Sequence, residues 1–375
     1  MPVAGGAARR PIAVVRLNGA ELNGVLSVKT TNVSHNAADT FQVELALSAQ
    51  PKNVADWAAW GGDNTNPEIE VLYGLVDANG NRSALNSAVL GPVDSVEVRQ
   101  PENIVSLSGR DYSAALLDTQ TYENFTNQTA SQIATTVAQR HGLTPVVQAT
   151  KTRVGAKDAD TNATTRNTRR ESEWDLLTKL ARDEGFVVYV RGRTLYFLPD
   201  TDPSGTPYLL TWSPPQSAGG SPRSNMIKLN VKRALTLAKT ITVTVISHDP
   251  ATATAVSQSA TSPGAPANGD AQTVPQLYTI DVPGLTADQA MVRAHQLLNS
   301  YSLFERVIEV HLPGDPFLWF EQPVKLSGTG TSWDQTYFAD RIEREMSMGG
   351  GFTMVIRAKN HSTTQNAGSI PQGNG

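Results

Sequence analysis

Two groups of closely spaced carboxylates are the residues of this sequence that come nearest to a catalytic arrangement. Glu171, Glu173 and Asp175 form the first group, and Asp183 and Glu184 form the second. A pair of facing carboxylates is the machinery of most glycoside hydrolases, in which one acts as acid and the other as base or nucleophile. Each group also lies at one end of a predicted helix, and acids at a helix start complement its dipole. We interpret both groups as helix-end residues and keep a cell-wall hydrolase as an alternative.

Histidine, cysteine and the common catalytic motifs give no second candidate. The chain has no cysteine, so disulfides, thiolate catalysis and cysteine-held metals are excluded. None of its histidines lies in H-E-x-x-H or in another close metal-ligand spacing. The sequence also lacks a G-x-S-x-G elbow, a P-loop and a G-x-G-x-x-G following a strand. It therefore predicts a protein that is not an enzyme and holds no cofactor or metal. The histidines are His35, His141, His248, His295, His311 and His361.

The composition is that of a globular protein with two or three domains. The 375 residues are 39% apolar and 18% charged, which is the balance of a folded chain. The net charge of −4 gives no general attraction to nucleic acid or to an anionic membrane. The sequence shows no signal peptide and no apolar run that could span a bilayer, so no membrane insertion is expected. We expect a chain that is made in the cytoplasm and stays there or leaves within a larger particle.

Residues 1–120 alternate apolar and polar side chains, as half-buried strands do. Asn18-Gly19 after "IAVVRL" is typical of a tight hairpin turn. Phe41 and Val43 share one face of a following strand. The spacing of these strands predicts a first β-barrel or sandwich. The further strands are expected at 69–75, 91–98 and 103–112.

Residues 121–224 change to a mixed α and β pattern. Thr129 and Gln132 have the spacing of a capping box at the start of one helix. Ser172 caps a second helix, which Gly185 ends. A proline-rich stretch then follows and has the composition of a linker. We expect an α+β insert in this range, with the linker at 210–224.

The second helix of this insert has a well-marked buried face. Trp174, Leu177 and Ala181 form one stripe, as helical periodicity requires. Asp175 and Lys179 have the spacing of a favourable ion pair, worth about 0.3 kcal/mol. The chain continues from Gly185 into a hairpin that ends in "LYF".

A basic stretch at 151–170 precedes this helix. A site for single-stranded nucleic acid would interleave aromatic side chains with the basic ones, and none occurs there. We interpret the stretch as a solvated loop or a subunit contact.

Residues 225–360 return to β patterning. Their length and texture match those of residues 1–120, which suggests a duplicated module, although no residue-level repeat is apparent. A helix is expected at 286–301, and residues 251–276 are too low in complexity to form a core. The polar tail at 361–375 completes the chain.

The segment "DPFLWFEQP" places four apolar side chains in succession. Phe317, Leu318, Trp319 and Phe320 cannot all face one core from one strand, because successive residues point to opposite faces. At least one of them should meet another domain or another chain. A strand buried on both faces is the alternative. Phe317, Trp319 and Phe320 are the candidate subunit-interface residues.

Residues 171–197 resemble a signature of phage late control protein D and the baseplate hub proteins of contractile tails. The amino-terminal hub region of VgrG, the type VI secretion spike protein, is similar. "AADTFQVEL", "VSLSGRDYSAALLD", "AKTITVTVIS" and "LPGDPFLWFEQPVKLSG" match further hub segments in order, so that the resemblance covers roughly residues 10–360. The residues of the signature are Ser172, Trp174, Asp175, Leu176, Leu177, Glu184, Gly185, Phe186, Leu195, Tyr196 and Phe197.

The resemblance implies a mainly β (α+β) fold with two tube-like β-barrel modules and a helix–hairpin insert between them. It further implies a structural protein of a phage tail baseplate, in which three chains present six barrels in a pseudo-six-fold ring. Such a homotrimer would join the hexameric tail tube to a trimeric spike.

The partners implied are the tail tube protein, the spike protein and other baseplate proteins, and DNA would only pass through the lumen. The location implied is the virion tail baseplate, after synthesis in the host cytoplasm. A hub of a non-viral contractile injection system is the alternative within the same mechanics.

Overall fold

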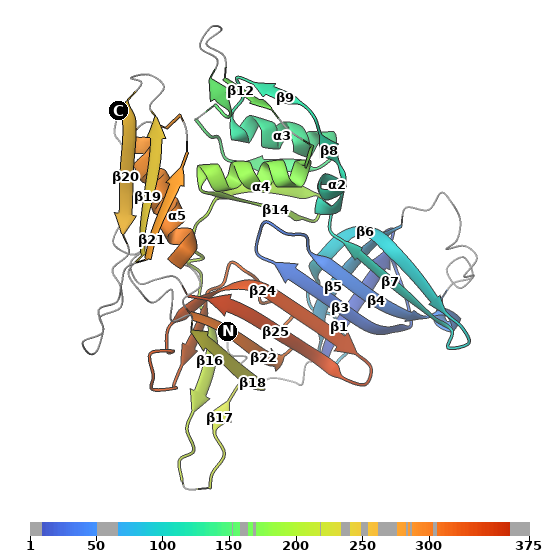
Figure 1. Ribbon diagram of the computed structural model, residues 1–375. Helices are drawn as coiled ribbons and strands as arrows, with labels where there is room; N and C mark the ends of the chain where they lie inside the picture. Colours follow the sequence, from blue (N-terminus) through green and yellow to red (C-terminus); the bar gives the residue numbers. More distant parts are fainter. Residues whose placement is uncertain are drawn as a thin grey trace.

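Strands make up most of the described chain, in agreement with the expected mainly β (α+β) class (Figure 1). Among the described residues, no helix is both long enough and apolar enough to cross a membrane. The predicted tail at 361–375 and most of the segment 251–276 lie outside these residues. The expectation that 251–276 contributes to no core is wrong for its described part, because β20 (Ala255–Thr261) is a strand that buries Ala260 in a core. The computed structural model describes residues 10–50, 67–151, 153–157, 164–167, 170–217, 219–233, 241–248, 254–261, 276–282, 284–285, 287–302 and 306–360.

The first module is a curved sheet of six main strands around one core. Asn18 and Gly19 have positive φ angles of 50° and 83°, which confirms the predicted hairpin turn. The strands are β1 (Arg10–Leu17), β2 (Ala20–Glu21), β3 (Val25–Val33), β4 (Thr40–Ala46), β5 (Glu68–Val76), β6 (Asn86–Arg99) and β7 (Ile104–Arg110). Their shared core includes Val15, Val28, Phe41, Val43, Leu45, Ile69, Val71 and Leu107.

The second module is built from strands that lie far apart in the sequence. Its core includes Leu210, Ile308, Val310, Leu326, Tyr337, Ile342 and Ile356. The first strand of this module, at 208–213, overlaps the stretch 210–224 that the sequence predicted to be linker, so that part of the prediction is wrong. The strands are β16 (Tyr208–Ser213), β17 (Arg223–Ser224), β18 (Lys228–Arg233), β22 (Arg306–Pro313), β23 (Val324–Ser327), β24 (Thr336–Ser347) and β25 (Gly351–Lys359).

The two modules share one strand order. Along the first sheet the main strands follow β1-β5-β6-β7-β4-β3, and along the second they follow β16-β23-β24-β25-β22-β18. Numbered within each module, both orders read 1-4-5-6-3-2. One pairing departs from the repeat, because β1 and β5 are antiparallel whereas β16 and β23 are parallel. The duplication suggested by the sequence is therefore present in the topology.

The fifth strand of each module carries the same irregularity. In β6 the pairing with β7 shifts between Val93 and Ser95, and in β24 the pairing with β25 shifts between Ala339 and Arg341. The extra residue is Asp94 in the first case and Asp340 in the second. A β-bulge of this kind bends a strand and increases its local twist. The repeated bulge fixes how positions in one module correspond to positions in the other.

Strands β3 and β24 join the modules into one sheet. They pair antiparallel from Arg341↔Val33 to Ser347↔Ser27. The result is a continuous antiparallel sheet of eight strands, in the order β18-β22-β25-β24-β3-β4-β7-β6, to which we refer as the eight-stranded sheet. Four of its strands come from each module.

The α+β insert follows the first module in the sequence, precedes the second and has its own core. Helix α3 (Ala130–Arg140) begins at the predicted capping box, and α4 (Glu173–Glu184) begins at Ser172 and ends at Gly185 in the left-handed conformation. Helix α2 (Ser113–Asp118) precedes them. The strands are β8 (Gln120–Thr121), β9 (Asn124–Thr126), β10 (Thr144–Val147), β11 (Ala156–Lys157), β12 (Thr164–Asn167), β13 (Glu171–Ser172), β14 (Phe186–Arg191) and β15 (Thr194–Pro199).

The predicted helix at 286–301 belongs to a separate three-stranded unit. Helix α5 (Ala287–Ser302) packs on β19 (Ile241–His248), β20 (Ala255–Thr261) and β21 (Gln276–Asp281). These strands pair only with one another among the described residues. The range 225–360 thus contributes to two separate sheets, where the sequence predicted a single β module. Figure 1 shows this unit above the second module and beside the insert.

Truncating a side chain in the buried stripe of α4 should destabilise the chain. Leu177 is fully buried, and we expect Leu177→Ala to lower the free energy of unfolding by about 2–5 kcal/mol, because it removes packing and leaves a cavity. Urea unfolding followed by circular dichroism measures this change. Lys179→Ala on the same helix is the matched control, since that side chain is half exposed and its ion pair with Glu171 contributes about 1 kcal/mol at most. Equal losses in the two variants would contradict the assigned packing.

Candidate functional site

A chain of buried polar side chains connects the second module, the first module and the insert. Arg344 of β24 donates a hydrogen bond to Oδ1 of Asn32 on β3 at 3.3 Å. Nδ2 of Asn32 donates to Asp39 at 2.8 Å. The backbone N–H of Asp39 donates to Asp111 at 3.2 Å, and Asp111 accepts from the backbone N–H of Ser113 at 3.0 Å, where α2 begins. We refer to Arg344, Asn32, Asp39 and Asp111 as the buried junction.

Arg344 is the most unusual member of the buried junction, because it is a fully buried arginine with 1% exposure. Its Nε donates to the carbonyl of Asp315 at 3.0 Å, and another guanidinium nitrogen donates to the carbonyl of Leu318. The guanidinium also lies 5.4 Å from the centre of the Trp319 ring. Burial lowers the pKa of Arg344. A buried charge is tolerated where hydrogen bonds of this kind replace its hydration, so this side chain fixes the segment 315–319 against the sheet.

The two carboxyl groups of the buried junction have raised pKa values. Removal from water raises the pKa of Asp39 to about 7, and the nearby Asp111 adds to the effect. Removal from water likewise raises the pKa of Asp111 to about 6. Desolvation disfavours the charged form of a carboxyl group. The junction is therefore expected to gain or lose protons in the mildly acidic range.

The loop between β3 and β4 attaches the first module to the insert. The backbone N–H of Asn36 donates to the carbonyl of Val188 on β14 at 2.8 Å. Burial lowers the pKa of the adjacent His35. At the end of the same strand, Arg191 lies 4.8 Å from the centre of the Trp319 ring and pairs with Glu321 of the second module at 2.6 Å. The insert is thus held to both modules.

The three candidate interface residues lie in three different surroundings. Phe317 is 44% exposed and remains available to a partner. Trp319 lies between Arg191 of the insert and Arg344 of the sheet, so it meets another part of the same chain. Phe320 packs into the core of the second module with 8% exposure. The expectation that at least one of these side chains meets another domain holds for Trp319.

The signature residues of the insert serve its folding. Trp174 and Leu177 are buried in the insert core, and Phe186 packs against its edge. Gly185 has a φ of 71°, which suits glycine at a helix end. The expected ion pair between Asp175 and Lys179 is replaced, because Lys179 pairs with Glu171 at 2.5 Å.

Both carboxylate groups singled out in the sequence are engaged in structural contacts. Glu173 is fully buried and contacts Arg140 and His141. Asp183 pairs with Arg293 of α5 at 3.0 Å, and burial raises the pKa of Glu184. Within the described part of the chain, no three acidic or histidine side chains are grouped as a metal site would require.

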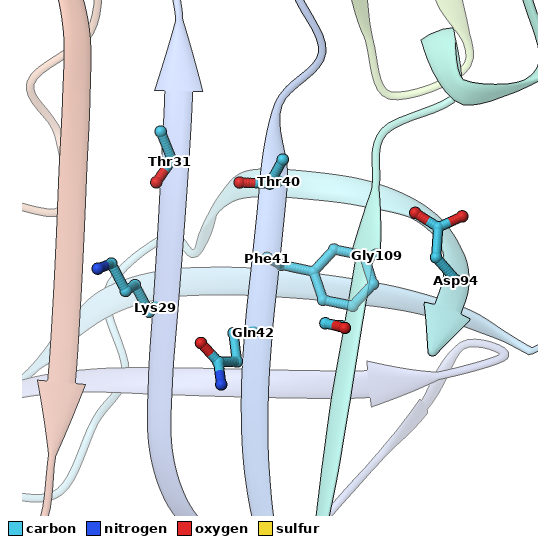
Figure 2. Close-up of a pocket in the computed structure, with 8 residues that line it drawn as sticks. Lys29, Thr31, Thr40, Phe41, Gln42, Asp94 and Gly109 are labelled. Carbon is cyan, nitrogen blue, oxygen red and sulfur yellow. The ribbon is translucent and has the colours of Figure 1, made fainter. Parts of the chain in front are cut away.

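The outer face of the eight-stranded sheet is polar and carries both signs of charge. Lys29 lies 3.9 Å from Glu343, and Arg341 lies 2.7 Å from the same carboxylate. Figure 2 shows part of this face as a hollow over β3, β4 and β7. Alternating positions of opposite charge give the face little net attraction for a polyanion. The hollow is lined by Lys29, Thr31, Thr40, Phe41, Gln42, Asp94, Ser108 and Gly109.

The buried junction was missed at the level of the sequence, although a signal was present. Arg344 falls between Ile342 and Met346 on the core-facing side of β24, and Asn32 falls on the core-facing side of β3. A polar residue at an inward position of an alternating strand predicts a buried hydrogen-bond partner. What the alternation does not reveal is which distant strand supplies that partner.

Comparison with known proteins shows the fold. No family model matches the chain, and no curated protein matches it. The tail protein from Neisseria meningitidis MC58 matches with a TM-score of 0.66 at 16% identity, over 94% of this chain and 97% of that one. The 43 kDa tail protein of prophage MuSo2 from Shewanella oneidensis matches with a TM-score of 0.59 at 16% identity, over 92% and 95%.

A type VI secretion protein has a similar structure. The E. coli c3393 protein, described as a secretion-system component similar to the T4 tail proteins gp27 and gp5, matches with a TM-score of 0.53 at 10% identity, over 93% and 77%. The chain therefore has the fold of phage tail proteins and VgrG-like hub proteins, and the fold implied by the sequence resemblance is confirmed.

Removing Arg344 should weaken the connection between the modules. We expect Arg344→Ala to lower the free energy of unfolding by at least about 3 kcal/mol, because it removes the donor from two buried oxygen acceptors and from one that is partly buried. Arg341→Ala, three residues earlier and half exposed, is the control and should cost less than about 1 kcal/mol. Denaturant unfolding measures both, and a neutral Arg344→Ala would overturn the role given to this side chain.

Stability should fall as the pH rises through the mildly acidic range. With a pKa raised from 3.8 to about 7, Asp39 holds a proton in the folded chain where the unfolded chain has lost it. The free energy of unfolding then decreases between those pH values, by up to about 1.4 kcal/mol per pH unit for one proton. Asp39→Asn should flatten this slope in urea unfolding measured at several pH values. An unchanged slope would contradict the raised pKa.

Proposed function

We propose that the chain is a structural hub protein of a contractile phage tail baseplate, without catalytic activity. The observation that supports this most directly is the eight-stranded sheet, to which two modules of the same strand order contribute four strands each. A repeated module within one chain lets a ring of a few chains present twice as many similar units. In this proposal three chains form a pseudo-six-fold ring that joins the hexameric tail tube to the trimeric spike.

The buried junction supports a mechanical role. Arg344, Asn32, Asp39 and Asp111 link β24, β3 and the start of the insert through hydrogen bonds that are shielded from water. Buried networks that are well satisfied rigidify the elements they connect. A hub must hold its modules at a fixed relative angle while a tube and a spike load its two sides, and this network is suited to that task.

The polar face of the eight-stranded sheet is the proposed lumen surface. Its acidic and basic side chains pair with one another, as Arg99 and Glu44 do, and as Lys29 and Glu343 do. Such a face would let DNA pass without holding it, because the phosphate backbone is bound by unpaired positive charge. The tail tube protein, the spike protein and other baseplate proteins are the proposed partners, and the virion tail baseplate is the proposed location.

A hub of a non-viral contractile injection system is the second candidate. The similarity to the E. coli type VI secretion component supports it, since the fold occurs in that setting as well. Capsid and terminase genes beside the gene for this chain would favour the phage, and toxin genes would favour the other machine. The cell-wall hydrolase has less support, because Glu173 and Asp183 are already engaged in ion pairs.

The proposal predicts the mass of the purified protein. Native mass spectrometry and light scattering of the full chain at its highest soluble concentration should give three copies, and electron microscopy should show a ring with a central opening. Purified sacculi should remain intact in its presence. A chain that stays monomeric, or that forms a closed dimer, would contradict the proposed hub, and lysis of sacculi would restore the hydrolase.

A further inference from the structure

The eight-stranded sheet ends in two strand edges that lie at its opposite ends. Strand β18 pairs with β22 alone among the described residues. At the other end, the first half of β6 pairs with β5, whereas Val93 to Arg99 pair with β7. The backbone N–H of Val93 donates to the carbonyl of Pro67 beside β5, so β5 and β7 lie on opposite edges of β6. Beyond Val93 the β5 side of β6 has no strand partner within the described residues.

The internal repeat relates these two edges to a joint that is already formed. In the shared strand order, β18 of the second module corresponds to β3 of the first, and β6 of the first corresponds to β24 of the second. Strands β3 and β24 pair with each other inside the chain. The chain therefore makes this joint once and presents both of its halves a second time, one at each end of the sheet.

The residues of β18 are more exposed than the corresponding residues of β3, which are covered by β24. Strand β18 pairs with β22 as β3 pairs with β4, and these pairings give the correspondence of single residues. Leu229 corresponds to Val28, and Val231 corresponds to Thr30. Val28 and Thr30 are fully buried, whereas Val231 is 44% exposed and Leu229 is partly exposed. Leu229 and Val231 are less buried because no neighbouring strand covers this edge of β18 within the described residues.

The β6 side shows the same difference. The shared bulge places Ser95 in correspondence with Arg341, so Val96 corresponds to Ile342 and Val98 to Arg344. Ile342 and Arg344 are buried, whereas Val96 and Val98 are only partly buried.

We infer that β18 of one copy pairs antiparallel with residues Ser95–Arg99 of β6 in a second copy of this chain. The joint would repeat between chains the pairing that β3 and β24 make within one chain. An edge strand that adds to another sheet gains main-chain hydrogen bonds along its length. Natural sheets guard their edges against unspecific pairing with charged side chains, and both of these edges carry them.

The register follows from the internal joint without adjustment. Arg344 pairs with Thr30 and Glu343 with Thr31. Carried over through the repeat, Val98 faces Val231 and Glu97 faces Lys232. This register brings together two partly exposed valines and two opposite charges, which are both favourable cross-strand pairs. A slip by one residue would place the valines on opposite faces of the sheet.

The contact is heterologous, since one copy supplies β18 and the next supplies β6. Contacts of this kind generate a closed ring when the rotation between copies closes, and an open filament when it does not. The inference rests on the proposed function for the closure at three chains. The pairing of β18 with β6 and its register rest on the repeat alone.

Disulfide trapping tests the pairing directly, because the chain has no cysteine of its own. Directly opposed residues in an antiparallel pair lie about 4.5–5.5 Å apart between Cα atoms, within the range that a disulfide spans. A chain carrying both Val98→Cys and Val231→Cys should form linked dimers and trimers on mild oxidation, seen on non-reducing gels and reversed by reductant. Equal mixtures of the two single variants should stop at dimers. Val98→Cys with Leu277→Cys is the control, since Leu277 is 75% exposed on the edge strand of another sheet.

The outcomes separate this inference from the proposed function. Trimers by mass together with cross-linking through 98 and 231 support both. Trimers by mass without this cross-link overturn the pairing and leave the hub standing. A cross-linked ladder that extends beyond three chains supports the pairing and contradicts the three-fold ring. A monomer that forms neither trimers nor cross-links at the highest soluble concentration overturns both.

Charge exchange tests the register. Glu97→Lys and Lys232→Glu should each weaken assembly by about fivefold at each contact, since each places like charges opposite one another. The chain with both substitutions restores opposite charges and should assemble as the unaltered chain does, in sedimentation experiments at low salt. If the double variant is no better than the single ones, Glu97 does not face Lys232 and the register is wrong.

Discussion

The antiparallel pairing of β24 with β3 is the interaction on which the rest of the structure depends. Strand β24 is shared: residues 338–347 pair with β25 in its own module, and residues 341–347 pair with β3 of the other. The inward side chain of Arg344 extends from this strand to Asn32 and to the carbonyl groups of the 315–318 segment. Main-chain hydrogen bonds and one buried cation therefore act on the same residues, so the two modules cannot rotate against each other without breaking both.

Because the two modules share one strand order, the joint between β24 and β3 indicates how other modules of this kind can pair. Two modules that share order, bulge and edge geometry but little visible sequence are expected to make equivalent contacts wherever equivalent edges meet. The chain satisfies one such contact internally, and the exposed valine of β18 and the half-covered second part of β6 are what remain. The chain shares its fold with phage tail proteins and with a type VI secretion component, while the role in an assembly and the ring are our proposal.

The sequence predicted best what depends on neighbouring residues. The Asn18-Gly19 turn, the capping box at Thr129 and the left-handed glycine at 185 are all local, and each is found as expected. The buried stripe of Trp174 and Leu177 follows from helical period alone. The sequence did not reveal that β19, β20 and β21 leave the second module to form their own sheet with α5, because strand patterns do not say which sheet a strand joins. The contact between Arg344 and Asn32 was missed for the same reason, since these two residues lie 312 positions apart in the sequence.

We propose that chains are joined through the same edge pairing that joins modules within a chain. An electron cryo-microscopy map of the assembled protein that resolves individual strands tests it most directly. We expect six modules related by rotations of about 60° around one axis, with β18 of each chain beside β6 of the next as β3 lies beside β24. A map in which the chains meet through the insert or the α5 unit, with β18 and β6 facing solvent, would show that this edge pairing does not join the chains.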